Sequence, residues 1–346
     1  MNNLGCSFLE EGIDFEPQKI CDCCISHTDG RGLPVLIKDY EGEPVDWEKL
    51  FEIKAQKIKQ QQEKTIFDCE GCYRLGEYTF KGEKKISEFH MSHCRICNAK
   101  CIYCSDEFSR SSLNYDTYPI IKDLFDKGYY KPGGEATFEG GEPTLMKSFN
   151  ELVEFFVING TRVRIHTSCI TYSALVEDAL KKNMGTVVVS LDSASKKTYA
   201  KIKLVDKFNI VVENLKKYAS ASNNNPDGIV VKYIIIPGVN DNIFEIDRFF
   251  KLMKQIGIKT VAVDIEVRYA RAYNNKNVSP HIYILYDYFE KQAKLYNMKL
   301  LVYSFISYVI KNRTFNVPVN INNKISLFLN INKYNEKNKN ISYYRK

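Results

Sequence analysis

Three cysteines within eight residues constrain this chain more than any other feature. The stretch is Cys97-Asn98-Ala99-Lys100-Cys101-Ile102-Tyr103-Cys104, a C-x3-C-x2-C spacing. Thiolates this close in sequence can bind three corners of a [4Fe–4S] cube from one short loop, which leaves the fourth iron open for another molecule. Chance gives this spacing in about one chain in a hundred of this composition, so the motif needs support from elsewhere.

Length and composition predict a soluble, globular, cytoplasmic protein. The 346 residues can form one large domain and a smaller one, with 44% hydrophobic and 26% charged residues. No apolar run reaches 18 residues, so we expect no membrane partner. Residues 1–16 are acidic and lack the basic start of a secretory signal. In the reducing cytoplasm, closely spaced cysteines favour metal sites over disulfides.

Two further cysteine clusters precede the loop. Between them lies a predicted helix from Trp47 to about Gln62, which Asp46 can cap. Clusters joined by a strand and a helix predict an auxiliary metal site, and either iron–sulfur or zinc fits such pairs. We therefore predict a small Cys-rich metal-binding module over residues 1–82. Its candidate ligands are Cys21, Cys23, Cys24, Cys69 and Cys72.

From residue 86 onward a strand–loop–helix pattern repeats six times. The predicted strands are 86–91, 135–139, 162–167, 186–191, 229–236 and 260–267. Their Val- and Ile-rich composition indicates parallel strands buried on both faces. We predict an α/β fold with a partial (β/α)6 parallel barrel over residues 83–275. A C-terminal extension, 276–346, should add a helix, a strand and an Asn/Lys-rich tail.

Local signals place the helix ends. Ser148 and Glu151 form a predicted capping box, and Ser173 begins the next helix. Gly185 is expected to close that helix, and Gly257 to end one that begins at Ile243.

Polar or glycine-rich segments follow most of the predicted strands. In parallel α/β sheets the active site lies at the carboxyl ends of the strands, so we expect these segments to surround one cavity. They are the cysteine loop, Gly140-Gly141-Glu142-Pro143, 190–193, 237–238 and 266–268.

In this order and context, these motifs resemble the radical S-adenosylmethionine (SAM) superfamily. The likeness covers about residues 86–271 and includes Ser190-Leu191-Asp192 and, in the helix that follows, Tyr199 to Ile202. It implies that Cys97, Cys101 and Cys104 ligate a [4Fe–4S] cluster whose open iron binds SAM. Reductive cleavage of SAM would give a 5′-deoxyadenosyl radical that abstracts hydrogen from a substrate. A reductant such as flavodoxin or ferredoxin is implied as a partner.

The resemblance also implies the cofactor-binding residues. Tyr103 would contact the adenine, with ordinary packing as the alternative. Gly140 and Gly141 would let the backbone approach the ligand, and Glu142, before Pro143, would hold the SAM ammonium. Ser190 and Asp192 would bond the ribose hydroxyls or the carboxylate, unless Asp192 only caps a helix.

Two features depart from the family pattern. The N-terminal clusters resemble a SPASM-like auxiliary-cluster module, but such modules usually follow the barrel. Cys94 extends the motif to C-x2-C-x3-C-x2-C and could close the open iron as a fourth ligand. We expect the strand geometry to point Cys94 away.

Two other functions stay open. One is a non-catalytic iron–sulfur protein for electron transfer or scaffolding, which would need Cys94 as a ligand. The other is a zinc-stabilised module whose basic tail contacts nucleic acid. The tail, 311–346, has eight Lys/Arg and one acid but no interleaved aromatic pattern, so we expect no nucleic-acid partner. The sequence does not identify the substrate, which could be a peptide, a sugar or a small metabolite.

Overall fold

The computed structural model describes residues 4–22, 35–63, 74–104, 115–272 and 279–303, together with 306, 307 and 310. Its internal contacts divide the chain into two compact units. Unit 1 comprises Met1–Asn98, Ser105–Thr167 and Ser173–Thr186. Unit 2 comprises Ala99–Cys104, Ser168–Tyr172 and Val187–Lys346. The division between Asn98 and Ala99 falls inside the cysteine motif.

The strands of unit 1 follow the order β8-β7-β6-β2-β3-β4, with β2, β6, β7 and β8 parallel. A separate antiparallel pair joins β1 to β5. The strand bounds are β1 Leu4–Gly5, β2 Gly12–Glu16, β3 Lys19–Cys21, β4 Val35–Lys38, β5 Gly76–Glu77, β6 Glu88–Met91, β7 Glu135–Phe138 and β8 Arg162–Thr167.

One parallel strand of this sheet comes from outside the predicted core. Strand β2 lies within residues 1–82 and pairs in register with β6, with Asp14 opposite His90. Part of the predicted N-terminal module therefore extends the sheet. The boundary at residue 82 stays a prediction.

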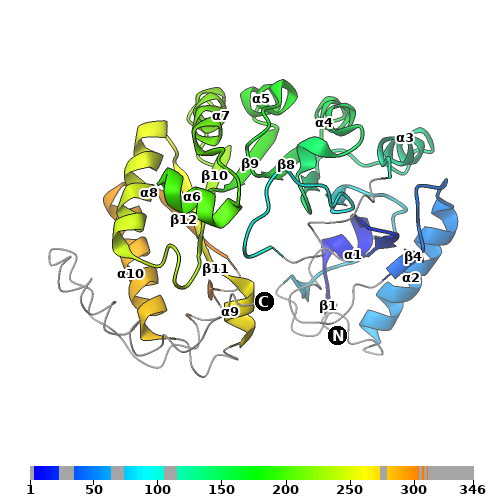
Figure 1. Ribbon diagram of the computed structural model, residues 1–346. Coiled ribbons are helices and arrows are strands. Elements are labelled where there is room, and N and C mark those ends of the chain that lie inside the picture. Colours follow the sequence, from blue (N-terminus) through cyan, green and yellow to red (C-terminus); the bar gives the residue numbers. More distant parts are fainter. Residues whose placement is uncertain are drawn as a thin grey trace. The chain divides into compact units, whose positions relative to one another are not determined.

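Helices pack on the apolar side of the unit 1 sheet. Their bounds are α1 Ser7–Glu11, α2 Trp47–Gln62, α3 Tyr118–Asp126, the 3-10 turn η3 Pro143–Leu145, α4 Phe149–Ile158 and α5 Ala174–Lys181. Figure 1 shows α5, α4, α3 and α2 following one another around the outer side of this unit. The Phe156 ring of α4 lies 5.0 Å from Phe89 and 6.1 Å from Phe138, which are both fully buried.

Unit 2 holds four parallel strands in the order β12-β11-β10-β9. Strand β9 begins two residues before the unit does. The bounds are β9 Gly185–Ser190, α6 Lys196–Lys203, α7 Phe208–Ala221, β10 Ile229–Ile235, α8 Ile243–Ile256, β11 Thr260–Ile265, α9 Val267–Ala272, α10 Pro280–Leu295 and β12 Lys299–Val302. Helices α7, α8 and α10 lie on one side of this unit (Figure 1).

The expectation that the strands are buried on both faces is correct for β9, β10 and β11 and wrong for β6 and β8. Every residue of β11 and all but one of β10 are buried. In β6 and β8, buried and half-buried residues alternate, because these strands face helices on only one side.

The six predicted β-then-α units are present, and the predicted α/β class with a parallel, unclosed sheet is confirmed. Two helix ends differ from prediction. Ser148 precedes α4, but its backbone is left-handed and its hydroxyl donates to Asp116 Oδ2 rather than capping the helix. Helix α5 ends at Lys181, and Gly185 begins β9 instead of closing the helix. None of the described helices is long and apolar enough to cross a membrane.

Candidate cofactor site

In unit 1 the start of the cysteine loop lies against the Gly-Gly-Glu turn that follows β7. The Gly141 N–H donates to the Cys94 carbonyl at 2.8 Å, and the Glu142 N–H donates to the Ile96 carbonyl at 2.8 Å. These bonds fix the backbone between β6 and Cys97.

Gly140 and Gly141 are required by this backbone contact. A Cβ atom on Gly141 would lie 2.3 Å from the Ile96 carbonyl oxygen. One on Gly140 would lie 2.9 Å from the Cys94 oxygen, and Gly140 also has a φ of +98°. Because the two glycines have no side chains, the backbone of the cysteine loop can lie directly against this turn.

Glu142 is fully buried, and one of its carboxylate oxygens is held by hydroxyls. Thr167 at the end of β8 donates to Oε1 at 2.7 Å, and Thr144 donates to the same atom at 2.8 Å. Pro143, also buried, begins η3. The Glu142 side chain is thus fixed at the carboxyl ends of β7 and β8.

The cysteines of this segment differ in exposure. Cys94 is fully buried and Cys97 is exposed. Burial raises the pKa of the Cys94 thiol, which opposes the thiolate form that a metal requires. Cys97 is the more accessible thiol.

In unit 2 the rest of the loop lies on the last turn of α6. The Lys100 N–H donates to the Lys203 carbonyl at 3.0 Å, and the Ile102 N–H donates to the Ile202 carbonyl at 2.9 Å. A turn bond from the Cys104 N–H to the Cys101 carbonyl closes the loop at 3.0 Å. Both cysteines are partly exposed.

Tyr103, between these two cysteines, belongs to a buried ionic network. Its hydroxyl donates to Asp192 Oδ2 at 2.7 Å, and Lys203 Nζ lies 2.6 Å from both oxygens. Burial alone would lower the pKa of Lys203, but the Asp192 carboxylate raises it above its ordinary value. The Tyr103 ring packs against an apolar cluster that includes Ile202 and Ile234.

Asp192 connects the backbone of β10 to Tyr103 of the cysteine loop through its carboxylate. Its Oδ1 accepts from the Ile234 N–H at 2.9 Å, and its own carbonyl accepts from Asn240 at 2.7 Å. The alternative that Asp192 caps a helix is wrong, because Ser195 caps α6. Ser190 is half-buried at the end of β9.

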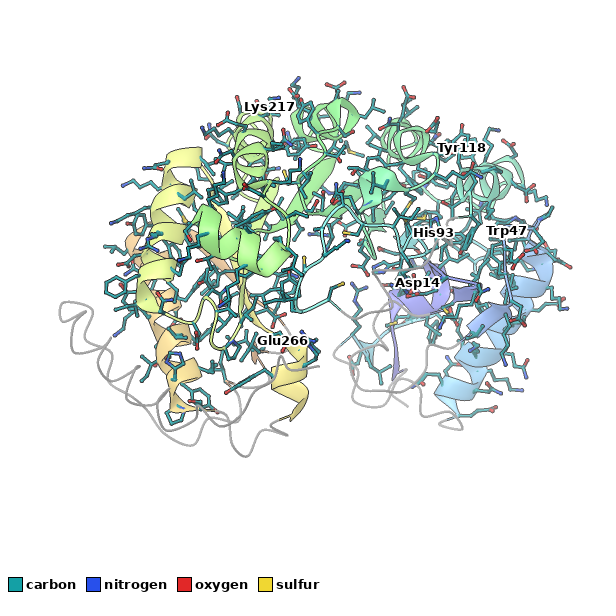
Figure 2. All side chains as sticks on the ribbon, viewed as in Figure 1. Asp14, Trp47, His93, Tyr118, Lys217 and Glu266 are labelled. Atoms are coloured by element: carbon teal, nitrogen blue, oxygen red, sulfur yellow. The ribbon has the colours of Figure 1, made fainter. Side chains whose placement is uncertain are left out.

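The segment after β11 also holds the loop. The Arg268 guanidinium donates to the Ile102 carbonyl, and its Nε donates to Glu266 Oε1 at 2.8 Å. Glu266 is buried and accepts from the Tyr269 N–H at 2.9 Å. Figure 2 labels Glu266 where α9 begins. Segments after β9 and β11 therefore converge on the loop within unit 2, as their positions at strand ends predicted.

The auxiliary ligands are mostly outside the described residues, namely Cys23, Cys24, Cys69 and Cys72. Cys21 is described and is fully buried, and burial raises the pKa of its thiol. Across the described ranges, no three metal-ligating side chains are gathered around a single-ion site. The auxiliary site stays a prediction.

The other face of the unit 1 sheet is polar. The strand register places Asp14, His90, Thr137 and Arg164 in one row, and Glu88 and Glu135 in the next. Arg164 pairs with Glu135 at 2.7 Å, and nearby Arg95 pairs with Glu16 at 2.7 Å.

Asp14, labelled in Figure 2, shows how acidic this face is. Burial raises its pKa well above the ordinary value, and the charges of Glu16 and Glu139 raise it further. Within the described part of the chain, Asp14 Oδ1 has no hydrogen-bond partner. Both arginines named for this face are already paired with carboxylates.

Sequence reasoning did not single out Lys203. It noted Tyr199 to Ile202 in the same helix but assigned no role to Lys203. A lysine in the last turn of a helix is ordinary, and this one is distinguished by its burial against Asp192 and Tyr103 and by its backbone contact with the cysteine loop.

We predict that Gly141→Ala destabilises unit 1, because the added Cβ would break the bonds to Cys94 and Ile96. The expected loss is about 1–3 kcal/mol of unfolding free energy, measured by urea denaturation. Gly76→Ala is the matched control, since a Cβ there meets no described atom within 4 Å. Equal stability of the two variants would contradict the close approach.

Curated relatives share part of this chain. A GTP 3′,8-cyclase of Clostridium botulinum (strain Hall) is 26% identical over 190 residues, 54% of this chain and 58% of that protein. One of Haemophilus influenzae (strain PittEE) is 27% identical over 154 residues, 43% of this chain and 45% of that protein. The chain thus spans about half the length of these relatives.

Solved structures share the fold. SuiB of Streptococcus suis, bound to its precursor peptide SuiA, has a TM-score of 0.52 at 13% identity, over 83% of this chain and 61% of SuiB. At this identity the likeness shows the fold alone. The family model for the Radical SAM superfamily matches residues 91–253, which include the cysteine motif and the Gly-Gly-Glu-Pro turn. Residues 91–253 of this chain therefore match the radical SAM superfamily.

Proposed function

We propose that this chain is a radical SAM enzyme in which Cys97, Cys101 and Cys104 ligate one [4Fe–4S] cluster. The observation that carries the proposal is the loop itself. Its three thiols are exposed or partly exposed, it lies in the matched family domain, and backbone bonds hold it on both sides of Asn98. Soft thiolate ligands suit iron–sulfur clusters.

When bound, the cluster and SAM supply one-electron cleavage of the sulfonium C–S bond, which yields methionine and a 5′-deoxyadenosyl radical. The residues of the chain hold and orient these groups. The buried Glu142 carboxylate, fixed by Thr144 and Thr167, is suited to accept hydrogen bonds from the SAM ammonium. The electron would come from a protein such as flavodoxin or ferredoxin.

Asp192 has a different role from the one that the resemblance implied. Its two carboxylate oxygens already accept from Ile234, Tyr103 and Lys203. We propose that it holds the loop, and that Ser190 is the better candidate for direct contact with SAM at this strand end. The Tyr103 ring packs against an apolar cluster and its centroid lies 5.0 Å from the Lys203 ammonium, but the residue is only half-buried and remains a candidate for contact with the adenine.

Cys94 is proposed not to be a ligand. Its thiol is fully buried and its pKa is raised by that burial. A fourth protein thiolate would exclude SAM from the open iron. Whether Cys94 is a ligand therefore distinguishes a radical SAM enzyme from a non-catalytic iron–sulfur protein.

We predict that Cys97→Ala and Cys94→Ala behave oppositely. After anaerobic reconstitution, Cys97→Ala should lose most cluster-bound iron and at least 100-fold of the rate of 5′-deoxyadenosine release from SAM with dithionite. Cys94→Ala should keep both within about twofold. Iron and sulfide assays and chromatography of the nucleoside measure this. Loss of the cluster in Cys94→Ala would support four-cysteine ligation and contradict the proposal.

The polar face of the unit 1 sheet indicates a substrate class. Arg95 and Arg164 are paired with carboxylates there, and burial, followed by the charges of Glu16 and Glu139, raises the pKa of Asp14. A triphosphate would add negative charge to this face. We propose that the substrate presents a neutral or cationic group to it, in contrast to the GTP named for the curated relatives.

We therefore expect GTP not to stimulate this chain. The measurement is the rate of 5′-deoxyadenosine release with SAM and dithionite, with and without millimolar GTP. The two rates should agree within about twofold. A tenfold rise, with consumption of GTP, would refute the proposed substrate class while leaving the radical SAM chemistry intact.

A further inference from the structure

The buried Lys203 lies next to the cysteine loop but has no role in the SAM cleavage proposed above. Its side chain is 4% exposed, and its ammonium lies 2.6 Å from Asp192 and 2.6 Å from the Tyr103 hydroxyl. A buried cation is stable only when its hydrogen-bonding partners compensate for lost water. Here one of those partners is the residue between Cys101 and Cys104.

The backbone of the same residue holds the loop as well. The Lys203 carbonyl accepts from Lys100, and the neighbouring Ile202 carbonyl accepts from Ile102. Leu204, which ends the helix, has a left-handed φ of +53°. The helix stops there, and its last carbonyls, which lack partners within the helix, become available to the loop.

We propose that Lys203 is a positioning residue for the cluster-binding loop: its ammonium fixes Tyr103 between Cys101 and Cys104 and places a positive charge beside the cluster. This inference rests on the proposed function, because it assumes that Cys101 and Cys104 are cluster ligands. Cys101 is close enough to Lys203 to influence it electrostatically.

The positive charge of Lys203 should also affect the reduction potential of the cluster, apart from holding Tyr103 in place. A fixed cation near the ligands favours the reduced cluster, which carries one more negative charge than the oxidised cluster. Removing the cation should lower the reduction potential. A residue that only supports the fold would leave the potential unchanged.

The test compares three variants with the reconstituted full-length protein. Lys203→Met removes the charge and keeps much of the side-chain length, and Lys203→Arg keeps the charge. Lys201→Met is the matched control, because Lys201 is an exposed lysine in the same helix. The readouts are the rate of cluster loss to an iron chelator and the midpoint potential from a redox titration.

We expect Lys203→Met to lose its cluster at least fivefold faster and to be reduced at a lower potential. Lys203→Arg should recover most of the potential, and Lys201→Met should match the wild-type protein. Wild-type lifetime and potential in Lys203→Met would overturn the inference. So would an unchanged cluster with weakened SAM binding, because Lys203 would then be a SAM ligand rather than a positioning residue.

A second variant covers the case in which Lys203→Met fails to fold. Tyr103→Phe removes only the hydroxyl and leaves the ring on its apolar cluster. It should speed cluster loss while leaving the potential close to wild type, since the cation remains. A wild-type rate of cluster loss would contradict the role of the Tyr103 hydroxyl in positioning.

Alkylation of the cluster-free protein separates this inference from the proposed function. The hydrogen bonds of this network join protein atoms only, so Lys203→Met should increase the iodoacetamide reactivity of Cys101 and Cys104 at least threefold relative to Cys97, read by mass spectrometry. If the wild-type protein binds no [4Fe–4S] cluster, the proposed function fails, but this readout still applies. Unchanged relative reactivity would show that Lys203 does not hold the loop.

Discussion

The cysteine loop from residue 92 to 104 forms no helix or strand, so its backbone needs hydrogen-bond partners elsewhere. It finds two sets. Before Asn98, the carbonyls of Cys94 and Ile96 accept from the turn after β7. After Asn98, the N–H groups of Lys100 and Ile102 donate to the end of α6. We propose that this support of the backbone holds the thiols in place for a cluster.

This constraint changes how the family motifs are understood. The glycines of the Gly-Gly-Glu-Pro turn are usually read as making room for a ligand, yet a Cβ on Gly141 would first meet the Ile96 carbonyl. Asp192 resembles a cofactor-binding residue, yet its carboxylate links Tyr103, Lys203 and the β10 backbone. The two glycines and Asp192 thus shape the loop itself.

The sequence predicted most of the fold because its strongest signals are local. The runs of Val and Ile in β9, β10 and β11, and Gly257 after α8, specify buried strands and a helix end without tertiary information. Strand β2 was missed because Gly12–Glu16 carries two acids in five residues, which become buried only when β6 pairs beside them. Ser148 failed as a cap because Asp116, distant in sequence, binds its hydroxyl.

The candidate ligands could be predicted from the sequence, whereas the residues that hold the loop could not. The spacing of Cys97, Cys101 and Cys104 predicts a cluster site, while Lys203 and Arg268 contact the loop through backbone carbonyls and charge, which leave no pattern in the sequence.

The central claim is that three cysteines, not four, leave one iron open to SAM. The most direct measurement is the electron paramagnetic resonance spectrum of the dithionite-reduced protein before and after SAM is added. We predict that SAM shifts the g-values of the reduced cluster, because it coordinates the open iron. A [4Fe–4S] spectrum that SAM leaves unchanged would contradict the account.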